Sequence, residues 1–228
     1  MQYAIPPSEV PSVAIASSES RFPVHRIYCV GRNYAEHARE MGGNPEREPP
    51  FFFCKPADAV VASGSTIAYP LATHNLHHEV ELVVALQAGG VQIKPEAALG
   101  LVFGYAVGVD LTRRDLQQAM RDKGRPWDVG KAFDRAAPIG ALLQASASGH
   151  MSASGIELKV NGVTKQAADI SDMIWNVPDI IAHLSALFEL QAGDLIFTGT
   201  PAGVGPLQSG DRVDANIAGL PGLNFSVA

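Results

Sequence analysis

The acidic residues Glu79 and Glu81 occupy alternate positions of the segment His78–Leu86, whose apolar residues predict a β-strand. Side chains two positions apart on a strand point to the same side, so the two carboxylates are expected to converge. Asp110 ends another apolar run, Val102–Val109, where a carboxylate has no role in packing. Converging carboxylates repel one another unless a cation lies between them, and their oxygens favour a hard ion such as Mg²⁺ or Mn²⁺. We therefore predict that these three residues are metal ligands, the alternative being a solvated strand face.

The adjacent residues His77 and His78 offer ligands for zinc instead. Consecutive residues of a strand face opposite sides, so the two imidazoles are poorly placed to bind one ion. Zinc is therefore disfavoured.

His37 and Glu40 lie three residues apart in Tyr34–Met41 (YAEHAREM), a short polar segment predicted to be helical. That spacing places both side chains on one helix face, where the carboxylate can orient the imidazole. An imidazole supported in this way can take a proton from water, the alternative being an ordinary polar helix face. Little apolar surface anchors the helix, and Gly42–Gly43 and Pro45 follow it, so it is a candidate lid.

Four further polar residues could line the same site. Lys131, flanked by glycine and apolar residues, could face a centre where negative charge develops. Arg114 and Gln117 follow Asp110 by four and seven residues, on one face of a predicted helix, and could bind a substrate carboxylate. A glycine-rich turn could bring backbone N–H groups and the Thr200 hydroxyl close to an oxyanion. Solvent-exposed side chains and a simple tight turn are the alternatives.

Composition excludes several classes of protein. With 46% hydrophobic and 18% charged residues, the 228-residue chain is too apolar and too weakly charged to be disordered. A net charge of −6 argues against nucleic-acid binding, which needs a basic face. No apolar stretch approaches the ~20 residues that span a bilayer, and no signal-peptide pattern precedes Arg21, so the expected location is the cytoplasm without membrane attachment. The glycine-rich turn lacks the lysine and serine or threonine of a phosphate loop, which disfavours phosphoester hydrolysis.

The elements that position these residues are expected to be mostly strands, because 22 glycines and 16 prolines indicate many turns. Predicted strands cover 26–30, 51–56 (buried), 78–86, 102–109 and 194–198, with a hairpin at Asn161–Gly162. Predicted helices cover 34–41, 95–99, 112–123 and 177–190. Asn33 and Glu36 are expected to form a capping box at the first, and Thr112 is expected to cap the third. The last has an apolar stripe made of Ile180, Ile181, Leu184, Leu187 and Phe188. Cys29 and Cys54 are expected to be buried thiols. We expect residues 1–22 to form an N-terminal arm and residues 23–228 a single domain.

Several long segments, taken in order, resemble the fumarylacetoacetate hydrolase (FAH) family over nearly the whole chain from about Pro23. They are GRNYAEHAREMG (31–42), FFFCKPADAVV (51–61), HHEVEL (77–82), GYAVGVDLTRRDLQ (104–117), GRPWDVGKAFD (124–134), SDMIW (171–175) and GDLIFTGTPAGVGPLQSGD (193–211). The order of these long segments makes the resemblance far more specific than any one of them. It is closest to the acylpyruvate-cleaving branch of the family.

The resemblance implies an α+β, predominantly β fold: a mixed β-sandwich roll or pseudo-barrel with a few peripheral helices and a short lid helix, in a homodimer. It also implies roles for the residues already singled out: Glu79, Glu81 and Asp110 hold Mg²⁺ or Mn²⁺, His37 with Glu40 activates water, Lys131 with Gln117 stabilises the oxyanion or enolate, and Arg114 and Thr200 line the substrate site. Arg32, or an arginine of the pair Arg113–Arg114, is expected to bind a second substrate carboxylate.

The expected activity is metal-dependent hydrolysis of a C–C bond in an acylpyruvate, with the small keto acid fumarylpyruvate giving fumarate and pyruvate in gentisate catabolism. The alternatives are decarboxylation of oxaloacetate, decarboxylation or isomerisation of 5-carboxymethyl-2-oxo-hex-3-ene-1,7-dioate, and non-catalytic metal or ligand binding on the same fold. The pair His37 and Glu40 favours hydrolysis, because decarboxylation needs an electron sink but no water-activating base.

Overall fold

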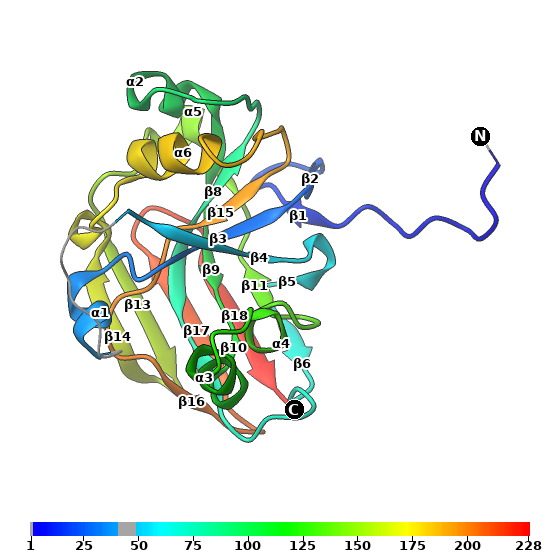
Figure 1. Ribbon diagram of the computed structural model, residues 1–228, viewed down its shortest axis with the longest axis vertical. Coiled ribbons are helices and arrows are strands. Elements are labelled where there is room, and N and C mark those ends of the chain that lie inside the picture. The colour runs from blue at the N-terminus through cyan, green and yellow to red at the C-terminus, as the bar shows by residue number, and fades with distance from the viewer. Residues whose placement is uncertain (1, 41–48) are drawn as a thin grey trace.

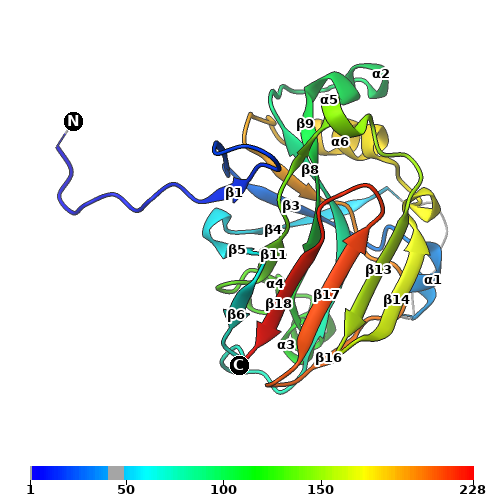
Figure 2. The ribbon, with the colours of Figure 1, turned by 180° about the vertical axis from the view of Figure 1, so that it is seen from behind.

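The computed structural model describes residues 2–40 and 49–228, and strands dominate this part of the chain (Figure 1). An eight-stranded sheet has the spatial order β4 (Phe51–Lys55), β3 (Ile27–Gly31), β15 (Leu195–Phe197), β8 (Val80–Leu86), β9 (Val102–Val109), β11 (Ala137–Ile139) and β5 (Val60–Ala62), with β12 (Leu143–Gln144) paired to β9. A five-stranded sheet has the order β14 (Val163–Asp169), β13 (Gly155–Val160), β17 (Arg212–Ile217), β18 (Leu223–Val227) and β6 (Ser65–Ile67), and Figure 2 shows it across the back of the molecule. A third sheet has the order β10 (Thr112–Arg113), β7 (Leu76–His78) and β16 (Gly205–Leu207). A separate two-stranded sheet pairs β1 (Ser12–Ala14) with β2 (Arg21–Pro23).

Short helices surround these sheets: α1 (Ala35–Glu40), α2 (Pro95–Ala98), α3 (Arg114–Asp122), α4 (Asp128–Lys131), α5 (Ala145–Ser148) and α6 (Val177–Ser185). Single 3₁₀ turns cover Ala57–Ala59, Leu99–Leu101 and Ile170–Asp172. Residues 2–11, which precede β1, extend away from the body (Figure 1). Within the described ranges, no helix has the length and apolar character needed to cross a membrane. The predicted α+β, predominantly β fold is confirmed.

Strand β8 shows how the core is organised and why the acidic residues converge. All of its residues are buried, and they alternate between two hydrophobic clusters: Val80, Leu82, Val84 and Leu86 lie in one, and Val83 and Ala85 lie in the other. Alternation with a period of two is what a strand covered on both faces requires. Glu81 therefore points to the same side of the sheet as Val83 and Ala85, near the start of β8.

Strand β4 is less buried than the sequence predicts. It lies at one edge of the eight-stranded sheet, where neighbouring elements cover it incompletely. Phe51 and Cys54 are exposed, while Lys55 is buried. Cys29, on the adjacent strand β3, is buried as expected, but the prediction of a buried Cys54 is wrong.

The hairpin prediction is confirmed, because β13 and β14 pair around Asn161 and Gly162, whose φ angles of 52° and 79° are those of a type I′ turn. Two helix boundaries differ from their predictions. Thr112 does not cap α3, because it belongs to β10 and the helix starts at Arg114. Helix α6 ends at Ser185, so Leu187 and Phe188 are exposed and lie outside the stripe that Ile180, Ile181 and Leu184 do form.

Candidate active site

The three predicted metal ligands come together at the ends of β8 and β9. Glu79 directly precedes β8, Glu81 lies within it, and the Asp110 backbone N–H donates a hydrogen bond of 2.8 Å to the Glu79 carbonyl oxygen. One carboxylate oxygen from each of the three side chains lies within 4.8 Å of the others. All three residues are at least 95% buried, since their exposed fractions are 5%, 2% and 0%. The alternative of a solvated strand face is therefore excluded.

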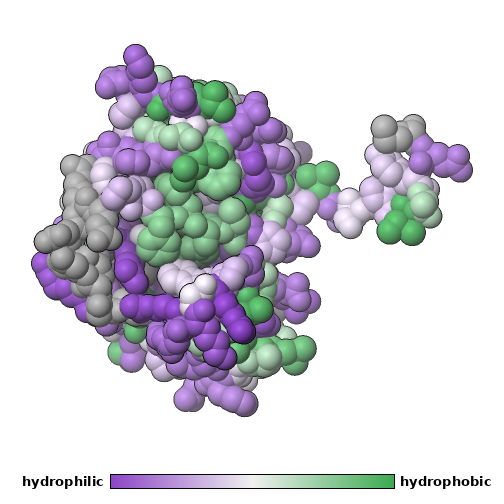
Figure 3. All heavy atoms as spheres, in the orientation of Figure 1, coloured by the Kyte–Doolittle hydropathy of each residue, from purple (hydrophilic) through white to green (hydrophobic). Residues whose placement is uncertain are grey.

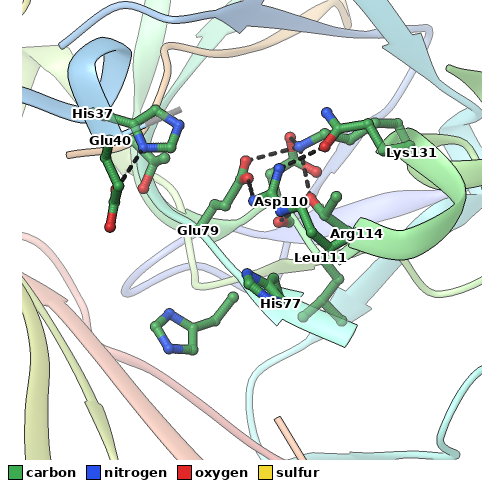
Figure 4. Close-up of polar contacts among 12 residues, drawn as sticks. His37, Glu40, His77, Glu79, Asp110, Leu111, Arg114 and Lys131 are labelled. Atoms are coloured by element: carbon green, nitrogen blue, oxygen red, sulfur yellow. Dashed lines mark hydrogen bonds and ion pairs between the residues drawn. The ribbon is translucent and has the colours of Figure 1, made fainter. Parts of the chain in front are cut away.

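Three cations contact two of these carboxylates (Figure 4). Lys131 Nζ donates to Glu79 Oε2 at 2.8 Å and to Asp110 Oδ2 at 2.7 Å. Arg114 forms an ion pair with Glu79, and Lys55 Nζ lies 2.7 Å from Asp110 Oδ1. Burial by itself raises the pKa of the Glu79 carboxyl, but the Lys131 and Arg114 charges lower it below its ordinary range. Burial lowers the pKa of Lys131, but Asp110 and Glu79 outweigh this effect and raise it above its ordinary value.

Glu81 has a different environment. Its Oε2 atom accepts a hydrogen bond of 2.8 Å from the Gly199 backbone N–H, and no cation of the described residues contacts it. Burial, together with the charges of Asp110 and Glu79, raises the pKa of the Glu81 carboxyl well above its ordinary value. A divalent cation between the three side chains would favour the ionised form of Glu81, and a donor set made of carboxylate oxygens suits Mg²⁺ or Mn²⁺. The residues present thus fit the predicted metal.

The two neighbouring histidines bond elsewhere. His77 Nε2 lies 2.9 Å from Asn75 Oδ1, and His78 Nδ1 lies 3.1 Å from Gln166 Oε1. Burial lowers the pKa of both imidazoles, that of His77 to about 4. Neither histidine belongs to the acidic cluster, which among the described residues consists of Glu79, Glu81 and Asp110.

His37 and Glu40 lie on one face of α1, as the spacing predicts. His37 Nδ1 lies 3.1 Å from Glu40 Oε2, and His37 is 6% exposed and lines the same pocket as the acidic residues. Since a carboxylate accepts the Nδ1 proton, the neutral ring keeps Nε2 as its free acceptor. His37 and Lys131 lie on opposite sides of Glu79 in Figure 4. The pair is therefore an imidazole oriented by a carboxylate, in the same pocket as the acidic triad.

Asn33 anchors the start of α1 in a way that differs from the predicted capping box. Its side-chain amide donates to the carbonyl oxygens of Trp175 and Thr198 at 2.9 and 2.8 Å and accepts from the Trp175 N–H at 2.7 Å. The completely buried amide is thus committed to distant segments and is not a cap for the helix. The predicted helix stop at Gly42–Gly43 and Pro45 lies outside the described residues.

The remaining predicted residues line the same pocket. Arg32, Arg114, Gln117 and Thr200 are part of its wall, and Arg114 donates to Gln117 Oε1 at 2.5 Å. Arg113 is not part of the wall, because its guanidinium stacks 4.4 Å above the Phe133 ring. Between the two arginines of the pair, only Arg114 faces the site. The wall also contains residues that were not predicted: Phe51, Phe53, Gln118, Arg121 and Trp127.

The Lys131 ammonium group is already fully hydrogen-bonded within the protein, unlike a group with a free N–H for an oxyanion. Its three N–H groups are directed at Glu79, Asp110 and the Thr112 hydroxyl, the last at 2.6 Å. In this arrangement Lys131 balances the charge of the carboxylates. Its contact with a developing oxyanion stays a prediction.

Sequence reasoning gave no role to two buried polar residues, Lys55 and Gln166. Lys55 ends the aromatic strand β4 and donates to the carbonyl oxygens of Leu111 and Lys131 at 3.1 and 2.5 Å, besides its ion pair with Asp110. A charged residue that ends an apolar strand is the same signal that identified Asp110, so Lys55 could have been found. Gln166 lies on the otherwise exposed or half-buried strand β14, and its sequence offers no such signal.

Replacing Lys55 with methionine is expected to destabilise the protein by about 3 kcal/mol, because it leaves the buried Asp110 carboxylate without one of its two cations. The free energy of unfolding in urea measures this effect. Lys159→Met is the matched control, since Lys159 pairs with Glu157 at the surface, where ion pairs contribute little. Equal losses for the two variants would contradict the role given to Lys55.

The fold and the site together define a class of enzyme: a curled β-sheet body in which a buried carboxylate triad that could hold a metal ion shares one pocket with an oriented imidazole. The chain belongs to the fumarylacetoacetate hydrolase family, since a model of the fumarylacetoacetate (FAA) hydrolase C-terminal region matches residues 26–228.

Individual relatives agree with this assignment. A crystal structure of fumarylpyruvate hydrolase from Pseudomonas aeruginosa, in complex with Mn²⁺ and pyruvate, is 55% identical with a TM-score of 0.97, covering 100% of this chain and 99% of that one. Fumarylpyruvate hydrolase of Ralstonia sp is 43% identical over 79% of this chain and 93% of its own length. The mitochondrial oxaloacetate tautomerase FAHD1 of Mus musculus is 42% identical over 88% of this chain and 90% of its own length. The acidic triad and the Mn²⁺ of the Pseudomonas aeruginosa structure support the predicted cofactor.

Proposed function

We propose that this protein hydrolyses the C–C bond of an acylpyruvate, and that fumarylpyruvate is its substrate, giving fumarate and pyruvate in gentisate catabolism. The observation that carries the proposal is the His37–Glu40 pair in one pocket with the carboxylate triad. Hydrolysis needs both a water-activating base and charge stabilisation, and this pocket contains groups for each. Relatives named fumarylpyruvate hydrolase, at 43% and 55% identity, support the choice of substrate.

The charge of the pocket suits a substrate with two carboxylates. Lys55, Arg114 and Lys131 all contact Glu79 or Asp110, and their three positive charges equal the charge of three ionised ligand carboxylates. Glu79, Glu81 and Asp110 would hold the metal, which adds two positive charges and stabilises an anion that develops on a nearby substrate oxygen. The metal, together with Arg32 in the same pocket wall, then gives the site an excess of positive charge, which suits the two carboxylates of fumarylpyruvate.

His37 is proposed to move the protons of the reaction. Nε2 takes a proton from water, and the hydroxide attacks the carbonyl carbon distal to the keto acid to give a tetrahedral alkoxide. Glu40, at Nδ1, stabilises the imidazolium and keeps the ring in place. Cleavage of the C–C bond then forms the new carboxylic acid and the enolate of pyruvate. The imidazolium returns its proton to the enolate carbon, which completes the turnover.

Assays of the purified protein with fumarylpyruvate, maleylpyruvate, acetylpyruvate and oxaloacetate test the proposal. Ultraviolet absorbance is expected to show Mg²⁺-dependent loss of fumarylpyruvate, with the highest kcat/KM of the four. Absence of turnover on all four would refute the proposal. The 42% identity to an oxaloacetate tautomerase makes action on oxaloacetate the second candidate, and an enzyme that turned over oxaloacetate alone would establish it.

Replacing Arg32 with glutamine is expected to raise KM for fumarylpyruvate about tenfold, because Arg32 lines the pocket and could bind the distal carboxylate. The Arg32 guanidinium lies 5.8 Å from the centre of the Phe51 ring. The backbone of Arg32 has a φ of 58°, in the left-handed region, so the chain turns sharply at this residue. Acetylpyruvate lacks the distal carboxylate, so its KM is expected to stay within about twofold. Arg113→Gln is the control, since that side chain packs on Phe133. An equal rise in KM for both substrates would contradict this role.

We also propose that the protein is a cytoplasmic homodimer in which residues 23–228 form the catalytic domain and residues 1–22 form an arm. Apolar side chains gather over β3 and β4 at the centre of one face, surrounded by hydrophilic ones (Figure 3). Surface of this kind supports association of subunits. Sedimentation equilibrium of the full chain measures the subunit number, and a monomer would refute the proposed dimer.

A further inference from the structure

Gln166 is completely buried and sits where β14 meets the glycine-rich loop that carries Thr200. The β13–β14 register shifts beside it, since Leu158 faces Gln166 while Lys159 faces Thr164. Such an irregularity changes the direction in which a strand side chain points. The loop approaches β14 closely at Gly203, where φ is 92° and an added Cβ would lie 2.2 Å from the Lys165 carbonyl oxygen. Strand and loop are thus shaped to bring Gln166 and Thr200 together.

Both polar atoms of the Gln166 side-chain amide form hydrogen bonds. Oε1 accepts from the Val80 backbone N–H at 3.0 Å and lies 3.1 Å from His78 Nδ1. Nε2 lies 2.9 Å from the Pro201 carbonyl oxygen and 2.8 Å from Thr200 Oγ1. A backbone N–H can only donate and a carbonyl oxygen can only accept, so Val80 and Pro201 fix the orientation of the amide.

This orientation determines the role of the Thr200 hydroxyl. Because Gln166 Nε2 donates to Thr200 Oγ1, the hydroxyl accepts that bond and keeps its own proton to donate. Among the residues that the structure describes, no acceptor is found for this proton, and Thr200 lines the pocket beside Glu81 and His37. The same logic makes His78 Nδ1 a donor, so a neutral His78 carries its proton on Nδ1.

We propose that Gln166 is a positioning residue that fixes the Thr200 hydroxyl as a hydrogen-bond donor to the substrate oxygen on which negative charge develops. This inference rests on the proposed hydrolysis, in which the tetrahedral alkoxide supplies such an oxygen. A donor oriented before the reaction stabilises that charge without reorganisation. Gln166 itself is not part of the pocket wall and acts through Thr200.

A double-mutant cycle with fumarylpyruvate tests the coupling, using Gln166→Met, Thr200→Val and the double variant. Without the amide, the Thr200 hydroxyl is free to donate to the vacated Pro201 carbonyl oxygen and turns away from the pocket. Each single variant is expected to lower kcat about tenfold with KM within about threefold. The double variant is expected to lose about tenfold, not hundredfold, and Thr200→Ser is expected to retain most of the activity. Losses that multiply, or an unaffected Thr200→Val, would overturn the proposal.

Loss of stability alone is a separate explanation, and Leu158→Val controls for it. Leu158 is a core residue on the neighbouring strand and pairs with Gln166 in the sheet. If Leu158→Val lowered kcat as much as Gln166→Met at equal loss of melting temperature, the positioning role would be refuted.

The nitrogen-15 chemical shifts of His78 give a measurement that does not depend on turnover. The proposed network requires the tautomer protonated at Nδ1, and the Nε2-protonated tautomer would overturn it. If His78 carries its proton on Nδ1 but none of the four keto acids is turned over, the proposed function is refuted while the hydrogen-bond network is confirmed.

Discussion

Replacing His37 with glutamine is expected to lower kcat for fumarylpyruvate by roughly 10²–10⁴-fold, the range that general bases contribute. Glutamine keeps a polar side chain in the pocket but has no nitrogen that can take a proton from water. KM is expected to change little, because the carboxylates of the substrate are bound by other groups. Steady-state kinetics with fumarylpyruvate measure both constants.

His74→Gln is the matched control, because His74 is exposed and lies outside the pocket wall. It is expected to leave kcat within about twofold. Glu40→Gln is expected to lower kcat less than His37→Gln does, since Glu40 acts through the orientation and charge of the imidazole. Unchanged turnover of fumarylpyruvate by His37→Gln would end the hydrolytic assignment. Loss of hydrolysis with retained decarboxylation of oxaloacetate would agree with it, because that reaction needs no base.

Removing the divalent metal with EDTA is expected to abolish turnover, and Mg²⁺ or Mn²⁺ is expected to restore it. Glu81→Gln is the most informative variant for this site, because Glu79 and Asp110 keep their ion pairs with Lys131, Arg114 and Lys55. Its turnover is expected to fall at least about 10³-fold, without recovery in excess Mg²⁺. A non-catalytic binding protein would lose its ligand on EDTA treatment but would have no turnover to recover.

The stability of Glu81→Gln separates loss of metal from loss of fold. Burial and two neighbouring carboxylates disfavour the ionised Glu81 side chain in the metal-free protein. Glutamine resembles the protonated form, so the metal-free variant is expected to melt at or above the temperature of the metal-free wild-type protein. Mg²⁺ is expected to raise the melting temperature of the wild-type protein but not that of the variant. An equal rise in both would show that Glu81 is not a ligand.

Local periodicity explains which parts of the site the sequence could predict. The period of two along a strand placed Glu79 and Glu81 on one side, and the spacing of three along a helix paired His37 with Glu40. The second relation lies within α1, whereas Glu79 directly precedes β8, because the predicted strand 78–86 is divided there into β7 and β8; the structure still brings the members of each pair together. The same reasoning failed for α6, because the apolar pattern continues to Leu190 while the helix ends at Ser185. Apolar residues beyond the end of a helix need not face the core.

Contacts between distant segments were decided only by the tertiary structure. Lys55 reaches Asp110 because the edge strand β4 packs against the loop that follows β9, and Gln166 joins Val80 and Thr200 across separations of 86 and 34 residues. The sequence by itself determined which groups could do chemistry: three carboxylates, an imidazole with its carboxylate, and cations to balance them. The fold decided which cation lies against which carboxylate and which hydroxyl keeps a proton to donate. Buried charges and buried amides select their partners by distance and direction in space, and spacing along the chain does not specify either.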